Sequence, residues 1–531
     1  NNMFGASLGN PIVKNKLFNF AIYEGWRQAN PINYFRPMPT DLERQGDFSQ
    51  SRNIAGGIRT IYDPNSTVVD PATNTVTRTP FSGNRIPTAQ MDPTSLRLLD
   101  QLWQPNGPGD NITGLNNFKT ILSNKTDYWN FSDRVDYIIN DQWRVSGRYS
   151  QLHTTTTSND PTPNNSLLYI VQNPSARHAR SVVGDAVWTA SPTTVINIHG
   201  DYHSLVDDFD SPRDYFPSSR LSEYWGNNQW YNGFLRTDNL PSYFPGVQIG
   251  SSGFGMGGTY WYQHPNGYSF SAKISQVRGN HYWKAGVDYR HSGGVSLVTQ
   301  NTNFNFTQAL TANTFNSPNT QVVGHEYATF LLGALDNNSR AIVKPVKNPR
   351  NQFWGFFLQD DWKLSRDLTL TFGLRYEVDT PWNDPYYQSS RYLELGQANA
   401  PMQANPPQVP AAVQPYLQQP WTYNGAWYYT DGDNPYSWKT PMNNFMPRVG
   451  LAWRINDKTS LRFGYSRFLS PASQVFINPP VSGFEALNFL EPSLPGFDAN
   501  QPVQGLLQGV PQATVNDPFP ANKNPLIAPR G

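Results

Sequence analysis

The dominant pattern along the chain is alternation of hydrophobic and polar residues, so that every second side chain points the same way. The segment 368–378 shows it best, with apolar residues at the even positions and polar residues or glycine between them. The same alternation recurs at 143–150, 283–290 and 460–466. A period of two predicts β-strands with one face in an apolar environment and the other in a polar one.

Short polar turns join these strands in pairs, as antiparallel hairpins require. Six such turns, which imply about twelve strands, fall at 14–16, 140–141, 191–192, 278–280, 365–367 and 456–458. Far longer stretches separate or follow the hairpins, at about 29–124, 155–176, 208–266, 299–350, 380–446 and 470–531. We therefore expect short turns at one end of the sheet and long loops at the other.

This asymmetry of the connections favours an outer-membrane barrel, which has short periplasmic turns and long extracellular loops. A soluble sandwich or propeller tends to mix loop lengths at both ends. Several apolar faces carry tryptophan beside a short turn, where amphipathic rings suit the lipid headgroups, although ordinary sandwich-core aromatics are the alternative. These residues are Trp143, Trp188, Trp283, Trp362 and Trp453. The predicted fold is all-β, an antiparallel up-and-down transmembrane β-barrel.

Composition narrows the class of protein further. The 531 residues carry 40 Lys and Arg against 39 Asp and Glu, a balance that argues against a nucleic-acid binder. The 40 glycines and 45 prolines exclude a coiled coil or helical bundle. The absence of cysteine excludes disulfides, thiolate metal sites and a cysteine nucleophile. No apolar run is long enough for a transmembrane helix, a test that leaves a barrel open.

The two ends of the chain and the long loops carry weaker signals. Asn1 to Phe4 lacks the basic and apolar regions of a signal peptide, and we interpret the chain as a piece of a longer protein. Thr40 to Glu43 has capping-box spacing, and Asp92-Pro93 predicts the start of a short helix. The segment His325 to Leu335 is another helical candidate. We expect such loops to fold over the barrel mouth.

Several blocks of sequence together resemble one known family. They are GASLGNPIVKNKLFNF at 5–20, LERQGDFS at 42–49, RTPFSGNRIP at 78–87, LQDDWK at 358–363 with LTLTFGLRYE at 368–377, and PRVGLAW at 447–453. In order and spacing they resemble the Oar-like TonB-dependent receptors of Gram-negative outer membranes. The first block resembles the first barrel hairpin of that family, and the next two resemble its first long loop.

The resemblance implies a 22-stranded barrel plugged by an N-terminal domain, usually preceded by a carboxypeptidase regulatory-like β domain. Residues 1–469 would then hold about twelve strands with their long loops, and 470–531 would be a truncated extracellular loop. The plug, the TonB-contacting segment and the C-terminal strands would lie outside the chain. The 470–531 loop would end before its return strand.

The family also implies a function, which is import of a solute through the plugged barrel after binding in the extracellular loops. The implied partners are outer-membrane lipid, the protein's own plug domain, the TonB complex and a solute such as an oligosaccharide or a peptide. We expect location in the outer membrane of a Gram-negative bacterium, with no enzymatic activity, no cofactor and no nucleic-acid partner.

Three short motifs match sites of other protein classes only in part. Gly5 to Gly9 fits G-x-S-x-G, but a strand-like hairpin follows where a nucleophile elbow needs a helix. Gly253 to Gly258 fits G-x-G-x-x-G without a following helix, so a flexible loop is the better interpretation. Asp431 to Asn434 departs from the EF-hand pattern, and we expect an Asx turn there.

One weak metal candidate comes from strand spacing. His199, Asp201 and His203 alternate, so on a strand they share one face and could present two imidazoles and a carboxylate to one ion. A polar cluster that only forms hydrogen bonds is the favoured alternative, and the predicted metal set is none.

Two larger groups are candidates for contacts with a solute. Residues of both charges fall on the inferred inner faces of the strands, where they would either contact a plug or a polar solute or form a solvated lumen wall. These residues are Arg134, Arg148, Lys284, Asp288, Arg290, Arg375, Glu377, Arg448 and Arg462. Loop aromatics could stack on sugars or peptide side chains, or pack one loop against another: Trp225, Trp230, Tyr231, Trp261, Tyr262, Trp421, Trp427 and Tyr428.

Two other classes of protein compete with the receptor. A secreted or surface β-rich adhesin or glycan-binding protein without transport activity would be soluble without detergent. A glycoside hydrolase needs two carboxylates across a cleft, and no pair in the sequence stands out for that role.

Overall fold

The main element of the computed structural model is one antiparallel sheet. The structure describes residues 1–70, 72–73, 76–158, 175–209, 218–226, 230, 244–250, 260–299, 303–313, 322–335, 339–343, 347–404, 424–470, 486–489, 506–507, 510–511 and 513–518. The strands of the sheet are β1 (Asn2–Val13), β2 (Leu17–Arg36), β5 (Phe118–Ile138), β6 (Trp143–Ser158), β7 (Ser175–Ser191), β8 (Thr194–Phe209), β10 (Tyr260–Arg278), β11 (His281–Thr299), β14 (Arg350–Lys363), β15 (Leu368–Asp379), β18 (Phe445–Asn456) and β19 (Thr459–Ser466).

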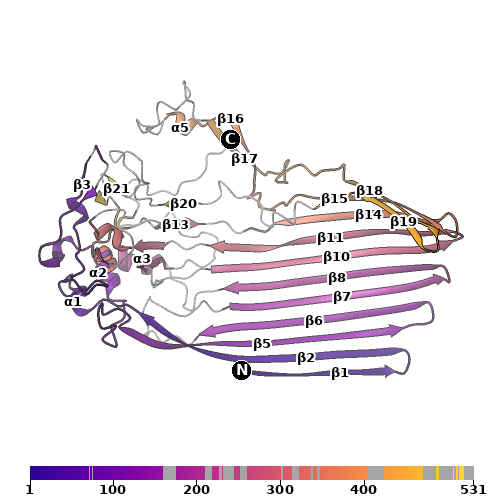
Figure 1. Cartoon of the computed structure of the whole chain (residues 1–531), viewed down its shortest axis with the longest axis horizontal. Helices are drawn as coiled ribbons and strands as arrows, with labels where there is room; N and C mark the ends of the chain where they lie inside the picture. The colour runs from indigo at the N-terminus through magenta and orange to yellow at the C-terminus, as the bar shows by residue number, and fades with distance from the viewer. Residues whose placement is uncertain are drawn as a thin grey trace.

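The strand order confirms the predicted up-and-down arrangement. The twelve strands follow one another in the sheet in chain order, and each pairs with its neighbours in antiparallel register. Six hairpins with short turns lie at one end, and the long loops lie at the other (Figure 1). Among the described strands, β1 and β19 each pair on one side only, so the sheet is an open part of a barrel.

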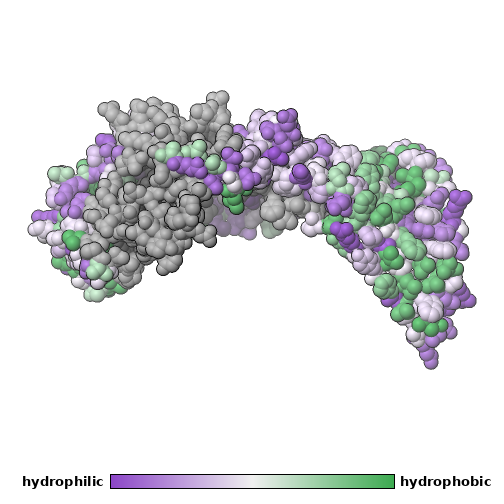
Figure 2. All heavy atoms as spheres, turned by 90° about the horizontal axis from the view of Figure 1, so that it is seen from above, coloured by the Kyte–Doolittle hydropathy of each residue, from purple (hydrophilic) through white to green (hydrophobic). Residues whose placement is uncertain are grey.

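The register separates the sheet into an apolar and a polar face. Tyr289 lies opposite Trp354, and Leu358 lies opposite Leu374. On this apolar face Trp354, Leu358 and Leu374 are exposed and Tyr289 is half-buried. The other face carries Arg, Asp, Ser and Gly, as at Ser269 opposite Arg290. In Figure 2 hydrophobic residues gather on the strands at the right, with hydrophilic residues along the short turns. An apolar outer face of this kind is what a lipid-facing barrel wall requires.

The strands at the start of the sheet extend further than the alternation predicts. β2 continues to Arg36 and pairs with β5 up to Phe118, so the first long loop covers 37–117 rather than 29–124. Both strands are about twice the length needed to cross a membrane at a tilt. Their outer ends therefore project beyond the apolar band toward the loops.

The loops fold into a unit with its own hydrophobic core. We call the described residues within 37–117, 218–250, 303–335 and 513–518 the loop domain, which gathers at the loop end of the sheet (Figure 1). Its helices are α1 (Asp41–Arg44), α2 (Pro93–Leu99), α3 (Ser218–Trp225) and α4 (Glu326–Leu331), with 3-10 turns at 64–66, 82–84, 88–90 and 308–311. Fully buried members of the core include Phe48, Ile61, Phe304, Phe330 and Val515.

Small sheets complete the loop domain and a separate hairpin. β9 (Gly246–Ile249) pairs in parallel with β12 (Asn303–Phe306), and β13 (Arg340–Val343) joins β12 to β20 (Ala486–Phe489). Three short pairs are β3 (Val68–Val69) with β4 (Val76–Thr77), β21 (Leu506–Leu507) with β22 (Val510–Pro511), and β16 (Ser390–Ala398) with β17 (Asn424–Tyr429). The helix α5 (Ala400–Ala404) lies between β16 and β17 in the chain. Within the part of the chain that the structure describes, no helix is long and apolar enough to cross a membrane.

Local signals in the loops are confirmed where the structure describes them. Thr40 and Glu43 form the capping box of α1 in both directions. Asp92 caps α2 with Pro93 at its first position, and His325 caps α4. Asp431 accepts backbone hydrogen bonds from residues 433 and 434, which is the expected Asx turn. The G-x-S-x-G match lies inside β1, and residues 253–258 lie outside the described residues.

Candidate functional site

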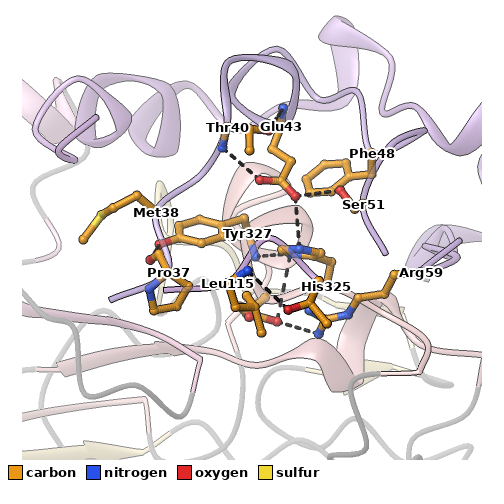
Figure 3. A network of polar contacts seen from close by, with 12 residues as sticks. Pro37, Met38, Thr40, Glu43, Phe48, Ser51, Arg59, Leu115, His325 and Tyr327 are labelled. Carbon is orange, nitrogen blue, oxygen red and sulfur yellow. Dashed lines mark hydrogen bonds and ion pairs between the residues drawn. The ribbon is translucent and has the colours of Figure 1, made fainter. Parts of the chain in front are cut away.

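A buried polar network joins the first long loop to the α4 segment (Figure 3). Its acidic group is Glu43, whose Oε2 accepts a hydrogen bond from the Thr40 backbone N–H at 2.9 Å. The Ser51 hydroxyl donates to Oε1 of Glu43 at 2.6 Å. Since the carboxylate also belongs to the α1 capping box, contacts within four residues of sequence help to position this charge.

His325 connects Glu43 to the second loop. Nδ1 of His325 accepts the backbone N–H of Tyr327 at 3.2 Å, so in a neutral ring the proton lies on Nε2. That nitrogen is 3.4 Å from Oε1 of Glu43. The ring packs on Phe48, with centroids 4.9 Å apart, and the Tyr327 hydroxyl donates to the Pro37 carbonyl at 2.8 Å. These contacts tie α4 to residues 37–48.

Arg59 supplies the balancing positive charge. It is 2 % exposed, and one terminal nitrogen lies 2.6 Å from Glu326 Oε2 and 3.0 Å from Gln308 Oε1. Glu326 follows the helix cap His325 directly, so the ion pair holds the start of α4. The Nε of Arg59 is buried with no hydrogen-bond partner among the residues that the structure describes. The network thus places one guanidinium and one imidazole between two carboxylates.

The ionisation of the site follows from these contacts. Burial raises the pKa of Glu43, but the hydrogen bond and charge of His325, with Ser51 and Thr40, lower it to about 2. For Glu326, burial is likewise outweighed by the charges of His325 and Arg59, so its pKa is lowered. Burial and then Glu326 and Glu43 raise the pKa of Tyr327. At neutral pH the site therefore holds two carboxylates beside a neutral phenol.

A cavity of about 440 Å³ adjoins this network. Glu43, Arg59, His325 and Tyr327 contribute to its wall, together with residues 105–117 of the same long loop. Its remaining polar lining includes Thr40, Gln50, Ser51, Arg52, Asp110, Asn111, Thr113 and Asn117. Hydroxyl, amide, carboxylate and guanidinium groups together can donate to and accept from a small polar solute.

The predicted loop aromatics divide into two groups. Trp225 and Trp230 are 1 % and 2 % exposed inside the loop core, so packing between loops is what the structure shows for them. Tyr231 and Trp421 lie outside the described residues, as does the side chain of Trp261. The half-buried residues of the set are Tyr262, Trp427 and Tyr428.

Tyr428 forms a stacked pair with another aromatic ring. It stacks on Tyr392 across the β16–β17 hairpin, with centroids 4.9 Å apart and planes inclined by 12°. Tyr392 is 46 % exposed, so the pair is open to solvent. A ligand role for these rings stays a prediction.

The predicted lumen charges all lie on the polar face of the sheet. The cross-strand register places Arg134, Arg148, Lys284, Asp288, Arg290, Arg375, Glu377, Arg448 and Arg462 on that one face. Arg375 binds Glu377 on its own strand and Asp288 at 3.2 Å across two strands. Lys284 lies 3.4 Å from Asp361. Their place in the lumen of a closed barrel stays a prediction.

His199, Asp201 and His203 do share that face. Nε2 of His199 is 3.5 Å and Nδ1 of His203 is 3.4 Å from different oxygens of Asp201, which also accepts from Ser269. Nδ1 of His199 is 2.8 Å from Asp185. The carboxylate therefore lies between the two rings as a hydrogen-bond acceptor. No group of three potential metal ligands is found among the described residues.

Sequence patterns revealed only part of the loop site. The capping box marked Glu43, and the helical candidate began at His325. Arg59 carries no local signal, because its partners Gln308 and Glu326 are about 250 residues away in the chain. The pairing depends on how two loops fold together, which no local spacing encodes.

Comparison with known proteins identifies the family. Residues 1–530 match the outer membrane beta barrel domain family, and the chain belongs to it. The protein is therefore an outer-membrane β-barrel protein, located in the outer membrane as predicted. A secreted, soluble form of the adhesin alternative does not fit this membership. Comparison with curated proteins gives no match.

Solved outer-membrane proteins are similar to the chain at low identity. The outer membrane transporter YddB from Escherichia coli is 10 % identical with a TM-score of 0.33, covering 87 % of this chain and 46 % of its own. The ferric-catecholate import receptor Fiu from E. coli K12 is 8 % identical, with a TM-score of 0.36 and coverages of 87 % and 53 %. The hemophore receptor HasR from Serratia marcescens is 10 % identical, with a TM-score of 0.35 and coverages of 87 % and 44 %. The chain spans about half the length of these structures.

Proposed function

We propose that the chain forms the first strands and the surface loops of a TonB-dependent receptor of the Oar-like kind. The receptor captures a solute at the loop domain and imports it through a barrel that its own plug domain closes. The TonB complex opens the plug from the periplasmic side. No catalytic role is assigned to these residues.

The observation that carries the proposal is the folded loop domain with its polar cavity. Loops that served only as connections would need no shared core and no buried ion pair, both of which cost conformational entropy to order. A cavity of about 440 Å³ is within the usual size of a ligand site. The blocks at 5–20, 42–49 and 78–87 add the resemblance to the receptor family.

The chemistry of the cavity favours a solute rich in hydroxyl or amide groups. The amides of Asn111 and Gln50 can donate and accept hydrogen bonds, the carboxylate of Asp110 can accept them, and the guanidinium of Arg52 can donate them. The cavity wall therefore offers both donors and acceptors to a solute. We propose an oligosaccharide or a peptide as the solute. Exposed rings such as Tyr428 would add stacking surface outside the cavity.

Solute binding by the intact protein in liposomes tests the proposal. Labelled oligosaccharides and peptides are offered in turn, and one class is expected to bind saturably. Arg52→Ala and Asn111→Ala are expected to weaken that binding about tenfold, as loss of one hydrogen bond to a bound solute does. Asn434→Ala, in a different loop, is the control and is expected to bind like the wild type.

Uptake in cells separates binding from transport. In cells lacking TonB, the bound solute is expected to remain at the surface, and in cells with TonB it is expected to enter. Uptake that continues without TonB, or indifference of the protein to both solute classes, would contradict the receptor function.

A further inference from the structure

The outer face of the sheet carries a basic site at the loop end of β10, β11 and β14. Gly293 of β11 lies opposite Asn266 of β10 and opposite Arg350 of β14. His291 precedes Gly293 by two residues on the same face and lies opposite Gln352. All of these residues share the face that carries Tyr289 and its neighbours lower on the strands.

The height of this site on the barrel wall follows from the tryptophans near the short turns. Trp283 precedes Gly293 by ten residues on β11, and Gln352 precedes Trp362 by ten residues on β14. Ten tilted strand residues correspond to an apolar band about 25 Å tall. Tryptophans mark one headgroup level, so the site lies at the opposite one, in the outward-facing leaflet.

Few carboxylates share this part of the wall. The outer face of β10 and β11 has none, and that of β14 has Asp360 only, next to the short turn and 2.6 Å from His281. On β8, Asp208 lies on the same face but is 3.0 Å from His264. Arg350 is exposed, and among the described residues its guanidinium forms no ion pair with a carboxylate.

Gly293 brings the two basic side chains together. A side-chain carbon at this glycine would lie 3.2 Å from Cγ of Arg350 and 3.4 Å from Nε2 of His291. Nδ1 of His291 is buried without a hydrogen-bond partner in the described part of the chain, and its ring stacks on Tyr268 with centroids 4.8 Å apart. A guanidinium without a carboxylate partner among the described residues, beside an imidazole, forms a site suited to an anion.

We propose that Arg350 and His291 bind the phosphate of an anionic lipid in the outward-facing leaflet. The lipid-facing position favours a headgroup over a soluble phosphate, because the apolar surface below the site accommodates acyl chains. Tyr289 and Trp354 form that surface, with ring centroids 4.3 Å apart. The site rests on membership of the outer-membrane family and is independent of which solute the loops bind.

A second arginine extends the site along the same level. Arg180 of β7 is exposed and lies opposite Ser204, which lies opposite Asn266. The row therefore runs from Arg180 to Arg350 across five neighbouring strands. Spaced cations of this kind suit a headgroup with more than one phosphate, since basic side chains near a lipid surface attract anionic lipids additively.

Lipid retention by the intact, detergent-purified protein tests the site. The probe is bisphosphorylated lipid A, compared with lipid A from which both phosphates have been removed, and adducts are counted by native mass spectrometry. The wild type is expected to retain the phosphorylated form preferentially. Arg350→Gln is expected to lower its occupancy about tenfold, because a charge-assisted phosphate contact is lost. His291→Gln is expected to lower it less, because an imidazole hydrogen bond is lost and the guanidinium remains.

Arg366→Gln, on the short turn after β14, removes a basic residue at the opposite leaflet and is expected to retain lipid like the wild type. Heat-modifiable migration on gels shows whether each variant is folded. Equal retention by a folded Arg350→Gln variant would overturn the proposal. So would equal binding of dephosphorylated lipid A, which indicates the apolar face alone, or displacement of the lipid by inorganic phosphate, which indicates a site for soluble anions.

Discussion

The guanidinium of Arg59 lies 2.6 Å from the carboxylate of Glu326, although 267 residues separate them in the chain. Both side chains are nearly buried, with 2 % and 12 % of their surfaces exposed. The pair therefore joins the first long loop to the α4 loop inside the loop domain. A charge pair in such a place makes the two loops depend on each other for their fold.

Removal of Arg59 is expected to open the loop domain. In Arg59→Leu the carboxylate of Glu326 stays buried without its partner, which costs about 3–5 kcal/mol. Opening of the loops in the detergent-purified protein is measured by native-state proteolysis. Arg85→Leu is the control, because its ion pair with Asp47 is exposed on the arginine side and is worth at most about 1 kcal/mol. Equal cleavage of the two variants would contradict a structural role for the buried pair.

The low pKa of Glu43 predicts how loop stability depends on pH. Its folded-state pKa of about 2 lies below the ordinary value of 4.5, so the ionised carboxylate stabilises the folded loops. That contribution is present above pH 4.5 and is lost as the pH falls through about 2. The stability difference between wild type and Glu43→Gln, measured by proteolysis with an acid-tolerant protease, is expected to shrink over this window. A difference that stays constant down to pH 2 would mean that Glu43 is not ionised in the folded loops.

Trp225 and Tyr428 are expected to differ in what they support. Trp225 is buried, and its Nε1 donates to the Val515 carbonyl at 2.6 Å, so Trp225→Ala is expected to destabilise the loop domain by about 3–5 kcal/mol. The backbone N–H of Val515 donates to the Gly333 carbonyl at 2.8 Å, and faster hydrogen exchange at this N–H would report the lower stability of the loop domain. Tyr428→Ala removes a half-buried ring and is expected to leave that exchange unchanged. Faster exchange in Tyr428→Ala would show that the hairpin supports the core.

The barrel strands could be predicted from sequence because their determinants are local. Within 368–378 each residue faces either lipid or the polar side, and the alternation records that choice residue by residue. The ends of the strands were harder to predict from the sequence. Beyond residue 29, β2 leaves the apolar band, so lipid no longer requires a hydrophobic residue at alternate positions and the pattern fades although pairing continues to Arg36.

The residues of the loop site could be predicted from the sequence only where a short-range motif marked them. The Thr40–Glu43 capping box is encoded within four residues, and the structure contains it. The burial of Trp225 depends on Val515, which lies 290 residues later, and no spacing in either loop indicates that contact. Exposed and buried loop aromatics therefore look alike in the sequence, which is why the predicted ligand set mixed the two.

The assignment of the two sheet faces makes a last prediction. Leu374 lies on the apolar face opposite Leu358 and is 49 % exposed, so Leu374→Arg places a charge in the lipid, at a cost of about 2–4 kcal/mol near the bilayer midplane. Ser271→Arg is the matched control, because Ser271 lies on the polar face opposite His199. Unfolding in urea of the protein folded into vesicles measures both. A Ser271→Arg variant that is destabilised as much as Leu374→Arg would mean that the polar face does not meet water or polar protein groups, and the two faces would have to be reassigned.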